Sequence, residues 1–310
     1  MYLVIYSKNF AQTYGFERAV MTSLNRNIIM KIPVILLNYN SSADCRKCVK
    51  FLKRQEGVEL EIVIVDNCSP REGEQESIKY LCEEQGCTFL AASKNRGYNA
   101  GNNIGLHYAT EKGYKYALIA NPDMEFPSVD YISRLVSKMS ENENIVIVAS
   151  DIIGIDKQHQ NPMHRDESFR DCLGWIKTSF NKKQTGVSDS LDNYRKSHFC
   201  SKVSGCCFLI CLDFVQSIGY FDESVFLYCE EAILSRQVEQ KGLKMYYLSD
   251  IQATHAHISS AKGNPIIRFG NWKQSRKYFI DNYSGYSFIM RIIAKLSLEM
   301  YVLAYKLYKK

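Results

Sequence analysis

Residues 116–125 read Tyr-Ala-Leu-Ile-Ala-Asn-Pro-Asp-Met-Glu, an unbroken apolar run that ends at a proline turn. Five apolar or aromatic residues in a row predict a strand covered on both faces, as in a parallel sheet. Pro122 cannot donate to a strand ladder, so Asp123 lies just beyond the carboxyl end of that strand. Ligands of open α/β sheets bind outside this end, where a carboxylate can hold a divalent cation. Taken alone, the triplet 121–123 favours an ordinary turn with a solvated aspartate; a nucleotide-dependent site is the functional alternative.

On both sides of this run, strand-like and helix-like segments alternate between residues 32 and 149. The expected strands cover residues 32–37, 61–65, 88–91, 116–120 and 145–149, and the expected helices cover 43–54, 74–85, 99–112 and 129–139. Repetition of strand and helix in this way is typical of a parallel sheet with helices on both faces. The sequence therefore predicts an α/β fold with a mostly parallel central sheet.

The rest of the chain is less regular. Between residues 151 and 201 the alternation gives way to polar sequence, which indicates a long loop or a small variable region. Order returns with an apolar stretch at 203–212, a helix at 230–241, strands at 244–248 and 251–254, and a helical stretch at 286–310. Residues 1–29 show no clear period, and Met30 directly precedes the first convincing strand. We therefore expect an extension at 1–29, hypothesised not to be native, a main domain at 30–262 and a basic helical tail at 263–310.

The composition is that of an ordinary globular protein. Of its 310 residues, 46% are hydrophobic and 23% are charged. No apolar run approaches the roughly 18 residues that a membrane span requires, and the start lacks the apolar core of a signal peptide, so we expect a cytosolic protein. The eleven cysteines, several of them inside apolar runs, are then expected to be reduced thiols. Cys45 and Cys48 form a CxxC, but no second pair follows at zinc spacing.

Positive charge is concentrated in the tail. From Lys262 to Lys310 there are ten Lys or Arg against two acidic residues, a net charge of +8, whereas the whole chain carries +6. A basic tail suits nucleic acid or an anionic membrane surface, and no nucleic-acid motif accompanies it. Within the helical stretch, charged and apolar residues gather on different sides, as Lys295 and Leu296 illustrate. Such a helix either packs on its own domain, which is slightly favoured, or lies at a membrane interface as a peripheral anchor.

Two further strand ends carry polar side chains that suit a nucleotide. Tyr39 and Asn40 follow the first strand, where an aromatic ring can stack on a base and an amide can bond a ribose. Asp66 and Asn67 follow the second strand, where the carboxylate can accept from a base N–H or a ribose hydroxyl. Ordinary turn and cap residues would look the same. A dinucleotide glycine fingerprint and a P-loop are both missing from the sequence, which excludes a P-loop NTPase.

An amide-rich segment precedes the third helix. It reads Asn-Arg-Gly-Tyr-Asn-Ala-Gly-Asn-Asn over residues 95–103. Its two glycines allow close approach of the backbone, and the following helix offers unpaired N–H groups to an anion. Asn95, Arg96 and Asn99 are candidate donor-binding residues, and Arg96 suits a diphosphate. A flexible turn is the alternative, although this density of amides before a helix favours function.

Two later motifs supply carboxylates and imidazoles. Glu230 and Glu231 begin a predicted helix, where they either stabilise the helix dipole or provide a general base. Neighbouring carboxylates repel, which would raise the pKa of one of them. His255 and His257 alternate along a strand, so both can face one site. Histidine is a common metal ligand and Asp123 would be its partner, yet such a histidine pair is more often structural or solvated.

Taken together, these motifs resemble family 2 glycosyltransferases of the GT-A fold, in particular bacterial sugar transferases of surface-polysaccharide assembly. The matching strings, in the order of the family, are Leu-Asn-Tyr-Asn (37–40), Ile-Val-Asp-Asn (64–67), the amide-rich segment (95–103), Asn-Pro-Asp (121–123), Ser-Gly-Cys-Cys-Phe-Leu-Ile (204–210), Gly-Tyr-Phe-Asp-Glu (219–223), Tyr-Cys-Glu-Glu (228–231) and His-Ala-His-Ile-Ser-Ser (255–260). Each string alone is weak, but eight strings in this order span about residues 32–262. The resemblance implies a Rossmann-like sheet and an inverting, metal-dependent transfer of a hexosyl or deoxyhexosyl group from a nucleotide sugar.

The resemblance also implies a role for each matching residue. The donor, a UDP- or dTDP-sugar, would be bound by Tyr39, Asn40, Asp66, Asn67, Asn95, Arg96, Asn99 and Asn121. Asp123 and His257 would bind Mg²⁺ or Mn²⁺. Glu231 would be the catalytic base, with Glu230 in reserve, although the family usually has Asp at position 231 and a second Asp where Ile233 stands. The acceptor would be a glycan or a polyprenyl-linked sugar at the cytosolic face of the membrane.

Two other classes compete with this interpretation. A glycosidase also uses two carboxylates, but it usually holds them farther apart than adjacent residues allow. A catalytically degenerate nucleotide-sugar-binding protein would explain the departures at Glu231 and Ile233. Turnover of a nucleotide sugar separates such a binder from an enzyme.

Overall fold

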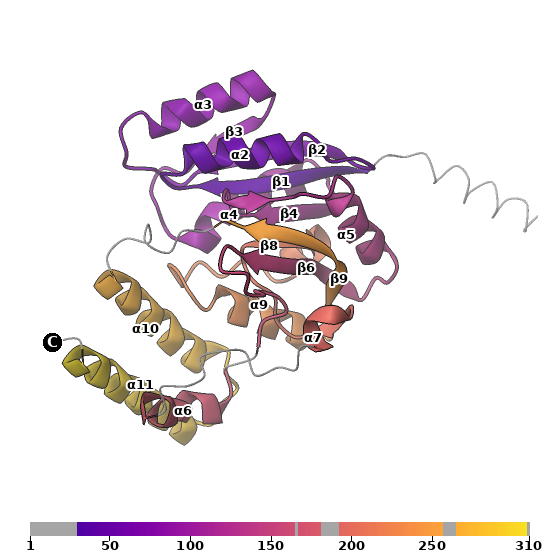
Figure 1. Cartoon of the computed structure of the whole chain (residues 1–310). Helices are drawn as coiled ribbons and strands as arrows, with labels where there is room; N and C mark the ends of the chain where they lie inside the picture. Colours follow the sequence, from indigo (N-terminus) through magenta and orange to yellow (C-terminus); the bar gives the residue numbers. More distant parts are fainter. Residues whose placement is uncertain (1–29, 165–166, 181–191, 257–264, 309–310) are drawn as a thin grey trace, which may run out of the picture.

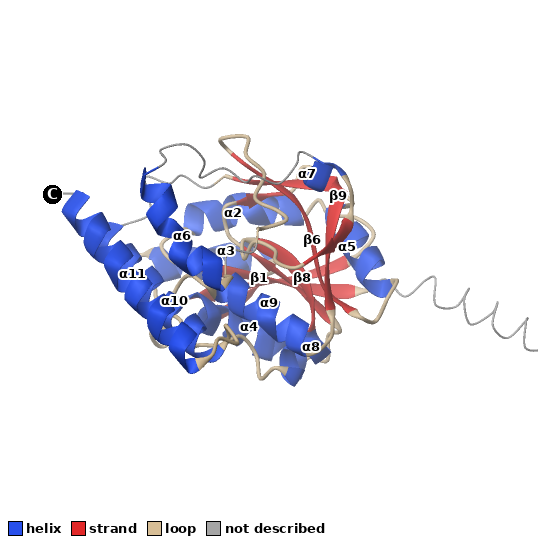
Figure 2. Ribbon diagram, turned by 90° about the horizontal axis from the view of Figure 1, so that it is seen from below, coloured by secondary structure: helices blue, strands red, loops and turns tan. Residues whose placement is uncertain are grey.

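The structure is a computed structural model that describes residues 30–164, 167–180, 192–256 and 265–308, so the expected extension at 1–29 lies outside it. Within these residues, nine strands form one sheet: β1 (Lys31–Asn38), β2 (Glu59–Asp66), β3 (Thr88–Ala91), β4 (Tyr116–Ala120), β5 (Met124–Glu125), β6 (Ile145–Gly154), β7 (His198–Cys200), β8 (Cys207–Cys211) and β9 (Lys244–His255). The helices are α2 (Ser42–Leu52), α3 (Glu74–Gln85), α4 (Tyr98–Glu111), α5 (Tyr131–Ser140), α6 (Phe169–Phe180), α7 (Asp192–Arg195), α8 (Leu212–Ser217), α9 (Glu230–Gln240), α10 (Pro265–Asn282) and α11 (Phe288–Tyr308). Figure 1 shows the sheet between layers of helices, and Figure 2 shows the same arrangement from below.

The strands follow each other across the sheet in the order β3-β2-β1-β4-β8-β6-β9-β5, and β7 pairs with β9. β1 pairs in parallel with β2 and β4, β2 with β3, and β6 with β9. β8 lies antiparallel between β4 and β6, while β5 and β7 run antiparallel to β9. Six of the nine described strands therefore run in one direction, which confirms the predicted α/β fold with a mostly parallel sheet.

Both faces of the sheet are buried, as the unbroken apolar runs predicted. Along β1, Ile32, Val34 and Leu36 belong to the core on one face, whereas Ile35 and Leu37 belong to the core on the other. Helices α2, α3 and α5 cover the first face, and α4, α8 and α9 cover the second. The carboxyl ends of β1, β2 and β4 meet at one edge of this covered sheet, where the sequence analysis expects a ligand.

The cysteines contribute to this core as free thiols. All eleven lie in the described residues, and all are free. Cys45 and Cys48, on α2, are buried in the first core, and burial raises the pKa of both thiols well above its usual value. A CxxC pair of free thiols packed in this way is structural.

The structure differs from the predicted elements at β5, a two-residue strand that was not expected, and in the second half of the chain. The strands expected at 244–248 and 251–254 are a single strand, β9, whose pairing with β6 shifts register between Ser150 and Asp151. The direction of β8 was not predicted, because a run of apolar residues looks the same whether its strand is parallel or antiparallel to its neighbours. The region 151–201 is more than a loop, since it contains the end of β6, the helices α6 and α7, and β7.

The tail consists of two helices, in agreement with the helical tail expected at 263–310, although only the helix at 286–310 was given bounds in advance. The two run antiparallel, with Trp272 of α10 against Tyr301 of α11 at one end (Figure 1). Ala294, Leu298 and Val302 of α11 are buried, and α11 contacts both α6 and α10. The outer face of α11 is exposed and apolar, and it consists of Ile289, Ile292, Ile293, Leu296, Met300 and Leu303. One face thus packs on the protein, as the favoured interpretation expects, and the other does not. Every helix in the described part of the chain is too short or too polar to span a lipid bilayer.

Candidate active site

The carboxyl ends of β1, β2 and β4 border an open pocket with a volume of about 560 Å³. Tyr39, Asn67, Asn95, Asn121 and Asp123 all contribute to its wall. Tyr39 is 47% exposed, so its ring is accessible to a flat partner such as a base. The structure thus brings together five of the ten residues that the sequence analysis assigned to the donor or the metal.

Asp66 and Asn40 build the turns beside this pocket. The Asp66 carboxylate is fully buried and accepts hydrogen bonds from Asn38 Nδ2 at 2.8 Å and Ser69 Oγ at 2.6 Å. Asn40 has a left-handed backbone, with φ 57°, and its side-chain oxygen accepts from Arg71 N at 3.1 Å. Both residues shape strand ends in this structure, and the donor contacts assigned to them stay predictions.

The amide-rich segment holds the pocket in shape. Asn67 Nδ2 donates to Asn95 Oδ1 and to Gly97 O, both at 3.2 Å, and Asn95 Oδ1 also accepts from Gly97 N at 2.9 Å. Gly97 lies against residues 221–229, called here the α9 loop, so closely that a Cβ would be 2.2 Å from Phe226 O. Its φ of 103° is open to glycine and strained for other residues. The close backbone approach that a glycine indicated therefore occurs within the protein itself.

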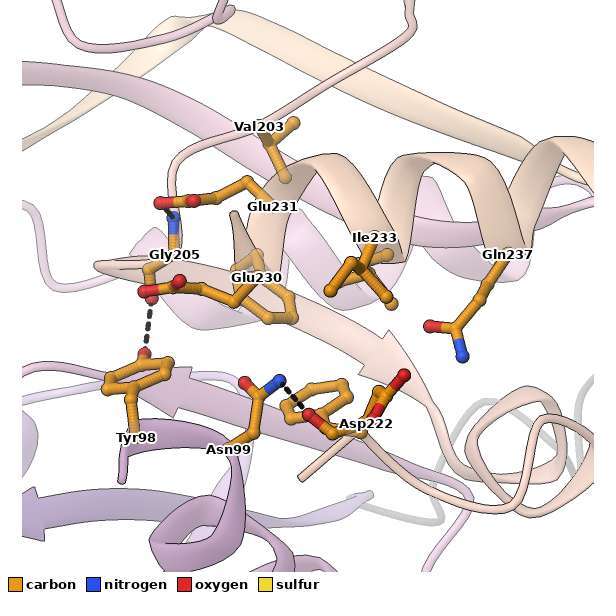
Figure 3. Close-up of a pocket in the computed structure, with 12 residues that line it drawn as sticks. Tyr98, Asn99, Val203, Gly205, Asp222, Glu230, Glu231, Ile233 and Gln237 are labelled. Atoms are coloured by element: carbon orange, nitrogen blue, oxygen red, sulfur yellow. Dashed lines mark hydrogen bonds between the residues drawn. The ribbon is translucent and has the colours of Figure 1, made fainter. Parts of the chain in front are cut away.

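Arg96 and Asn99 contact the α9 loop. Arg96 Nη2 lies 2.7 Å from Glu223 Oε2 in a partly exposed ion pair. Asn99 Nδ2 donates to Asp222 O at 2.7 Å (Figure 3). Asn103, which was not a predicted site residue, adds a hydrogen bond to Glu223 Oε1 at 2.9 Å. These side chains tie α4 to the loop in this structure, and their contacts with a donor stay predictions.

Asp123 pairs with a histidine from the end of β9. Asp123 Oδ1 lies 3.2 Å from His255 Nε2, and His255 Nδ1 lies 2.8 Å from Gln160 Oε1. Burial lowers the pKa of His255, but hydrogen bonds to Asp123 and Cys206 raise it, and the resulting pKa is about 10. In this structure His255 is therefore a cation paired with Asp123 at neutral pH. The sequence analysis assigned the metal to His257 instead, which lies outside the described residues.

Asp123 and His255 form the candidate metal centre. Carboxylate oxygens are ligands that Mg²⁺ and Mn²⁺ prefer, and neutral imidazole can join them. Among the described residues, no group of three or more His, Cys, Asp or Glu side chains is arranged to hold a metal ion. A cation at Asp123 would thus take further ligands from a bound donor or from residues outside the described ranges.

Glu230 and Glu231 lie in a second, small pocket of about 20 Å³ (Figure 3). Tyr98 lines both this pocket and the open one. Glu231 Oε1 accepts a hydrogen bond from Gly205 N at 3.3 Å, while Glu230 turns toward Tyr98 and Asn99. Burial, and then the negative charge of Glu231, raises the pKa of Glu230 to about 8. One carboxyl of the pair thus has the raised pKa that the sequence analysis expected, and Glu230 is protonated at neutral pH.

Tyr98 and helix α10 were missed as parts of the site. The Tyr98 hydroxyl donates to Gly205 O at 2.6 Å and so links the amide-rich segment to the Glu pair. Its position inside the motif at 95–103 was a signal that could have identified it. The sequence contained no comparable signal that α10 belongs to the site. Arg268 Nε of α10 donates to the hydroxyl of Tyr228 at 3.0 Å, and Tyr228 lies two residues before the Glu pair.

This fold and site define a class of protein. A mostly parallel sheet with an antiparallel strand beside the central strand, an acidic turn at the carboxyl edge and a Glu pair at the start of a later helix is the GT-A architecture of glycosyltransferases. The sequence model described as "Glycosyl transferase family 2" matches residues 34–213, more than half of the chain. The chain belongs to this family.

Three relatives illustrate the likeness. The low-salt glycan biosynthesis hexosyltransferase Agl10 of Haloferax volcanii is 23% identical over 235 residues, 75% of this chain and 69% of Agl10. The mannosyltransferase PcManGT from Pyrobaculum calidifontis, solved with GDP-Man and Mn²⁺, has a TM-score of 0.57 at 14% identity, over 90% of this chain and 75% of that one. GalNAc-T7 with UDP, GalNAc and Mn²⁺ has a TM-score of 0.60 at 15% identity, over 82% of this chain and 48% of that one. The two structures support the fold alone, and the predictions of a GT-A fold and of a glycosyltransferase are confirmed.

Proposed function

We propose that this glycosyltransferase moves a hexosyl or deoxyhexosyl group from a nucleotide sugar to an acceptor hydroxyl, with inversion at the anomeric carbon, in cell-surface polysaccharide synthesis. The observation that carries the proposal is the pair of pockets that share Tyr98. The open pocket contains Asp123, which suits the diphosphate side of a donor. The small pocket contains Glu231, which suits the proton acceptor of the reaction, although its volume of about 20 Å³ holds about one water and not a sugar. Direct displacement needs a leaving-group site and a proton acceptor on opposite sides of the reacting sugar.

The donor would bind in the open pocket. Tyr39 offers a ring to the base, while Asn67, Asn95 and Asn121 offer amides to the ribose and the diphosphate. Its volume of about 560 Å³ is typical of small-molecule sites, which range over roughly 300–1,000 Å³. Proteins of similar fold have been solved with GDP-Man or with UDP, and we propose a UDP- or dTDP-sugar for this chain.

Six of the eight residues assigned to the donor make hydrogen bonds or ion pairs with protein groups. They are Asn40, Asp66, Asn67, Asn95, Arg96 and Asn99. A donor contact by any of them would require these hydrogen bonds or ion pairs to open. We therefore regard Tyr39 and Asn121, which line the open pocket, as the principal donor contacts.

Mg²⁺ or Mn²⁺ would be held by Asp123, together with His255 or with His257. Mn²⁺ accompanies the nucleotide in both related structures. Such a cation, when bound, offsets the negative charge of the leaving nucleoside diphosphate. Asp123 supplies a carboxylate oxygen that suits such a cation, which would also take diphosphate oxygens as ligands. His255 could join it only after losing its proton, since its pKa of about 10 makes it a cation itself at neutral pH.

Glu231 would take the proton of the acceptor hydroxyl as its oxygen attacks the sugar. The hydrogen bond from Gly205 N stabilises the ionised form of Glu231, which a base requires. Glu230 is the reserve, but its pKa of about 8 keeps it protonated at neutral pH. The second Asp of the family has no suitable place here, because Ile233 is 1% exposed and packs with Phe279 in an apolar cluster.

Release of nucleotide tests this assignment. The protein would be mixed with a panel of nucleotide sugars and Mn²⁺, and released nucleotide would be measured with and without acceptor. Glu231→Gln is expected to lose turnover by roughly 10²-fold or more, as removal of a general base does, while the affinity for donor is retained. Glu239→Gln makes the same change on the outer part of α9, where Glu239 pairs with Arg236, and it should keep turnover. Equal turnover of Glu231→Gln and the parent protein would refute the base.

A catalytically degenerate nucleotide-sugar-binding protein is the second candidate. The observation that favours it is the departure from the family at Glu231 and Ile233, where an Asp is usual. It predicts binding of a nucleotide sugar without release of nucleotide, whatever the donor or acceptor. The same panel, combined with a direct measurement of donor binding, distinguishes the two.

The acceptor is proposed to be a glycan or a polyprenyl-linked sugar at the cytosolic face of the cell membrane. Residues 262–310 carry a net charge of +8. Their two acidic residues, Asp281 and Glu299, pair with lysines of the tail itself. The positive charge of the other Lys and Arg residues is not offset within the tail. An anionic lipid surface complements this charge, and its acyl region complements the exposed outer face of α11. The occupant that we propose for this face is an anionic bilayer.

A further inference from the structure

The α9 loop ends in two residues whose backbone is left-handed. Tyr228 has φ 72° and Cys229 has φ 66°, and Glu230 follows directly. Residues with a Cβ populate this region sparsely, and they persist there only where the surrounding structure holds them. The direction in which Glu230 and Glu231 leave the loop therefore depends on what holds Tyr228 and Cys229.

Helix α10 holds the end of this loop. Arg268 Nε donates to the hydroxyl of Tyr228 at 3.0 Å. Two turns farther along the helix, the buried Ser275 Oγ donates to Leu227 O at 2.8 Å. Both contacts act on the residues that come just before the Glu pair, one through a side chain and one through the backbone.

Helix α10 also holds the start of the loop and the helix that follows it. The hydroxyls of Tyr278 and of Tyr283, just beyond α10, donate to Asp222 Oδ2 at 2.8 Å and 2.6 Å. Phe279 is 1% exposed and packs with Ile233 in the first turn of α9. The loop is thus fixed by α10 on one side and by α4 on the other. The tail is therefore joined to the site by specific hydrogen bonds as well as by chain connectivity.

We infer that α10 is part of the active-site frame and that Arg268 is a positioning residue for the Glu pair. Arg268 acts through the phenol of Tyr228 and fixes the left-handed turn from which Glu230 and Glu231 project. The inference rests on the proposed role of Glu231. Helix α10 lies beyond residues 34–213, so the segment that matches the family does not include this device.

Four variants test the inference. Arg268→Met keeps the aliphatic stem and removes the donor, Tyr228→Phe removes the acceptor hydroxyl, and the double variant removes both. Lys277→Met is the matched control, because Lys277 lies on α10 but pairs with Glu299 of α11. In Arg268→Met and in Tyr228→Phe we expect kcat to fall roughly tenfold and the KM for the donor to stay unchanged. Loss of one hydrogen bond to a charged group can cause a change of this size. The double variant should be no slower than the slower single variant, because both changes remove the same hydrogen bond.

Hydrogen exchange gives a readout that does not depend on turnover. The amides of residues 226–231 should exchange faster in Arg268→Met and in Tyr228→Phe than in the parent protein, and Lys277→Met should match the parent. Unchanged exchange of these amides in Arg268→Met, or an equal loss of kcat in Lys277→Met, would overturn the inference. A parent protein without turnover would refute the proposed function instead, and hydrogen exchange alone would then decide whether α10 fixes the loop.

Discussion

Glu230 and Glu231 are adjacent in the sequence and lie in different environments. Glu231 Oε1 accepts from Gly205 N, whereas Glu230 Oε2 has no hydrogen-bond partner within the described residues. A Cβ at position 205 would lie 3.2 Å from Glu231 Oε1, so the glycine leaves room for the carboxylate to reach the backbone N–H. Environments that separate the pKa values of two neighbouring acids divide the roles of proton carrier and proton acceptor between them.

Glu230→Gln should change how stability depends on pH. The pKa of Glu230 in the folded protein, about 8, is above its ordinary value of 4.5, so folding favours the protonated form. The stability that this group contributes is complete below about pH 4.5 and is lost as the pH rises toward 8. The glutamine variant should therefore gain stability relative to the parent across this window, by at most ~1.4 kcal/mol per pH unit. Thermal unfolding of both proteins at several pH values measures the difference, and a difference that does not vary with pH would contradict the raised pKa.

At the residue scale, the sequence indicated which residues line the site, but it did not indicate which partners those residues contact. Tyr39, Asn121 and Asp123 follow apolar strands, and the parallel alternation puts such positions at one edge of the sheet. Asn99, in contrast, bonds the backbone of Asp222, 123 residues away in the sequence. A local pattern contains no information about such a partner. The sequence could therefore suggest the donor pocket but not the engagement of Arg96 and Asn99 with the α9 loop.

At the element scale, apolar runs located the strands but not all of their directions. β8 is a buried run of five residues like β4, and only its pairing shows that it runs the other way. The bounds of helix α10, inside the helical tail expected at 263–310, were not predicted for a different reason. Its side chains make hydrogen bonds to the α9 loop, through Arg268 and Ser275, and an aromatic contact to α11, through Trp272. A helix that packs through polar and aromatic groups on several sides does not repeat apolar residues at helical spacing.

Gly97→Ala should loosen the junction between α4 and the α9 loop. The added Cβ would lie 2.2 Å from Phe226 O, a backbone atom that can move only if the loop moves, and the φ of 103° is strained for alanine. We expect the free energy of unfolding to fall by ~3 kcal/mol or more. Gly113→Ala is the matched control, because Gly113 also has a positive φ, of 75°, but nothing lies within 4 Å of its Cβ position.

The control should lose only the cost of the left-handed backbone, ~1–2 kcal/mol. Chemical denaturation of both variants, analysed with a common slope, gives the two losses. Equal losses would show that the α9 loop yields easily at Phe226 and that the close contact with Gly97 does not constrain it.

At the scale of the whole molecule, the tail has two different sides. Its inner side, through α10, contacts the α9 loop just before the Glu pair, and its outer side, on α11, is apolar and exposed. The tail also carries the positive charge of the chain, because residues 262–310 have a net charge of +8 and the whole protein has +6. An exposed apolar face on a tail of net positive charge suits the anionic bilayer that is proposed above as its partner.

Leu296→Glu should release the protein from anionic vesicles. The side chains on the outer face of α11 are between 41% and 68% exposed, and none of them lines either pocket. Burial of one leucine side chain is worth ~1.5–3 kcal/mol, so its replacement by a charge should reduce binding roughly tenfold or more. Tyr80→Glu makes the same change of charge at an exposed side chain of α3, at the opposite end of the molecule (Figure 1), and should bind like the parent.

Co-sedimentation with phosphatidylcholine vesicles, with and without phosphatidylglycerol, measures this binding. The parent should bind only when the anionic lipid is present, and binding should weaken with added salt because the Debye length falls from about 10 Å at 0.1 M to about 3 Å at 1 M. Turnover with a water-soluble acceptor should be the same in Leu296→Glu as in the parent, since the outer face of α11 is separate from both pockets. If Leu296→Glu and Tyr80→Glu bind the vesicles equally well, or if the parent does not bind them, the bilayer is not the partner of this face.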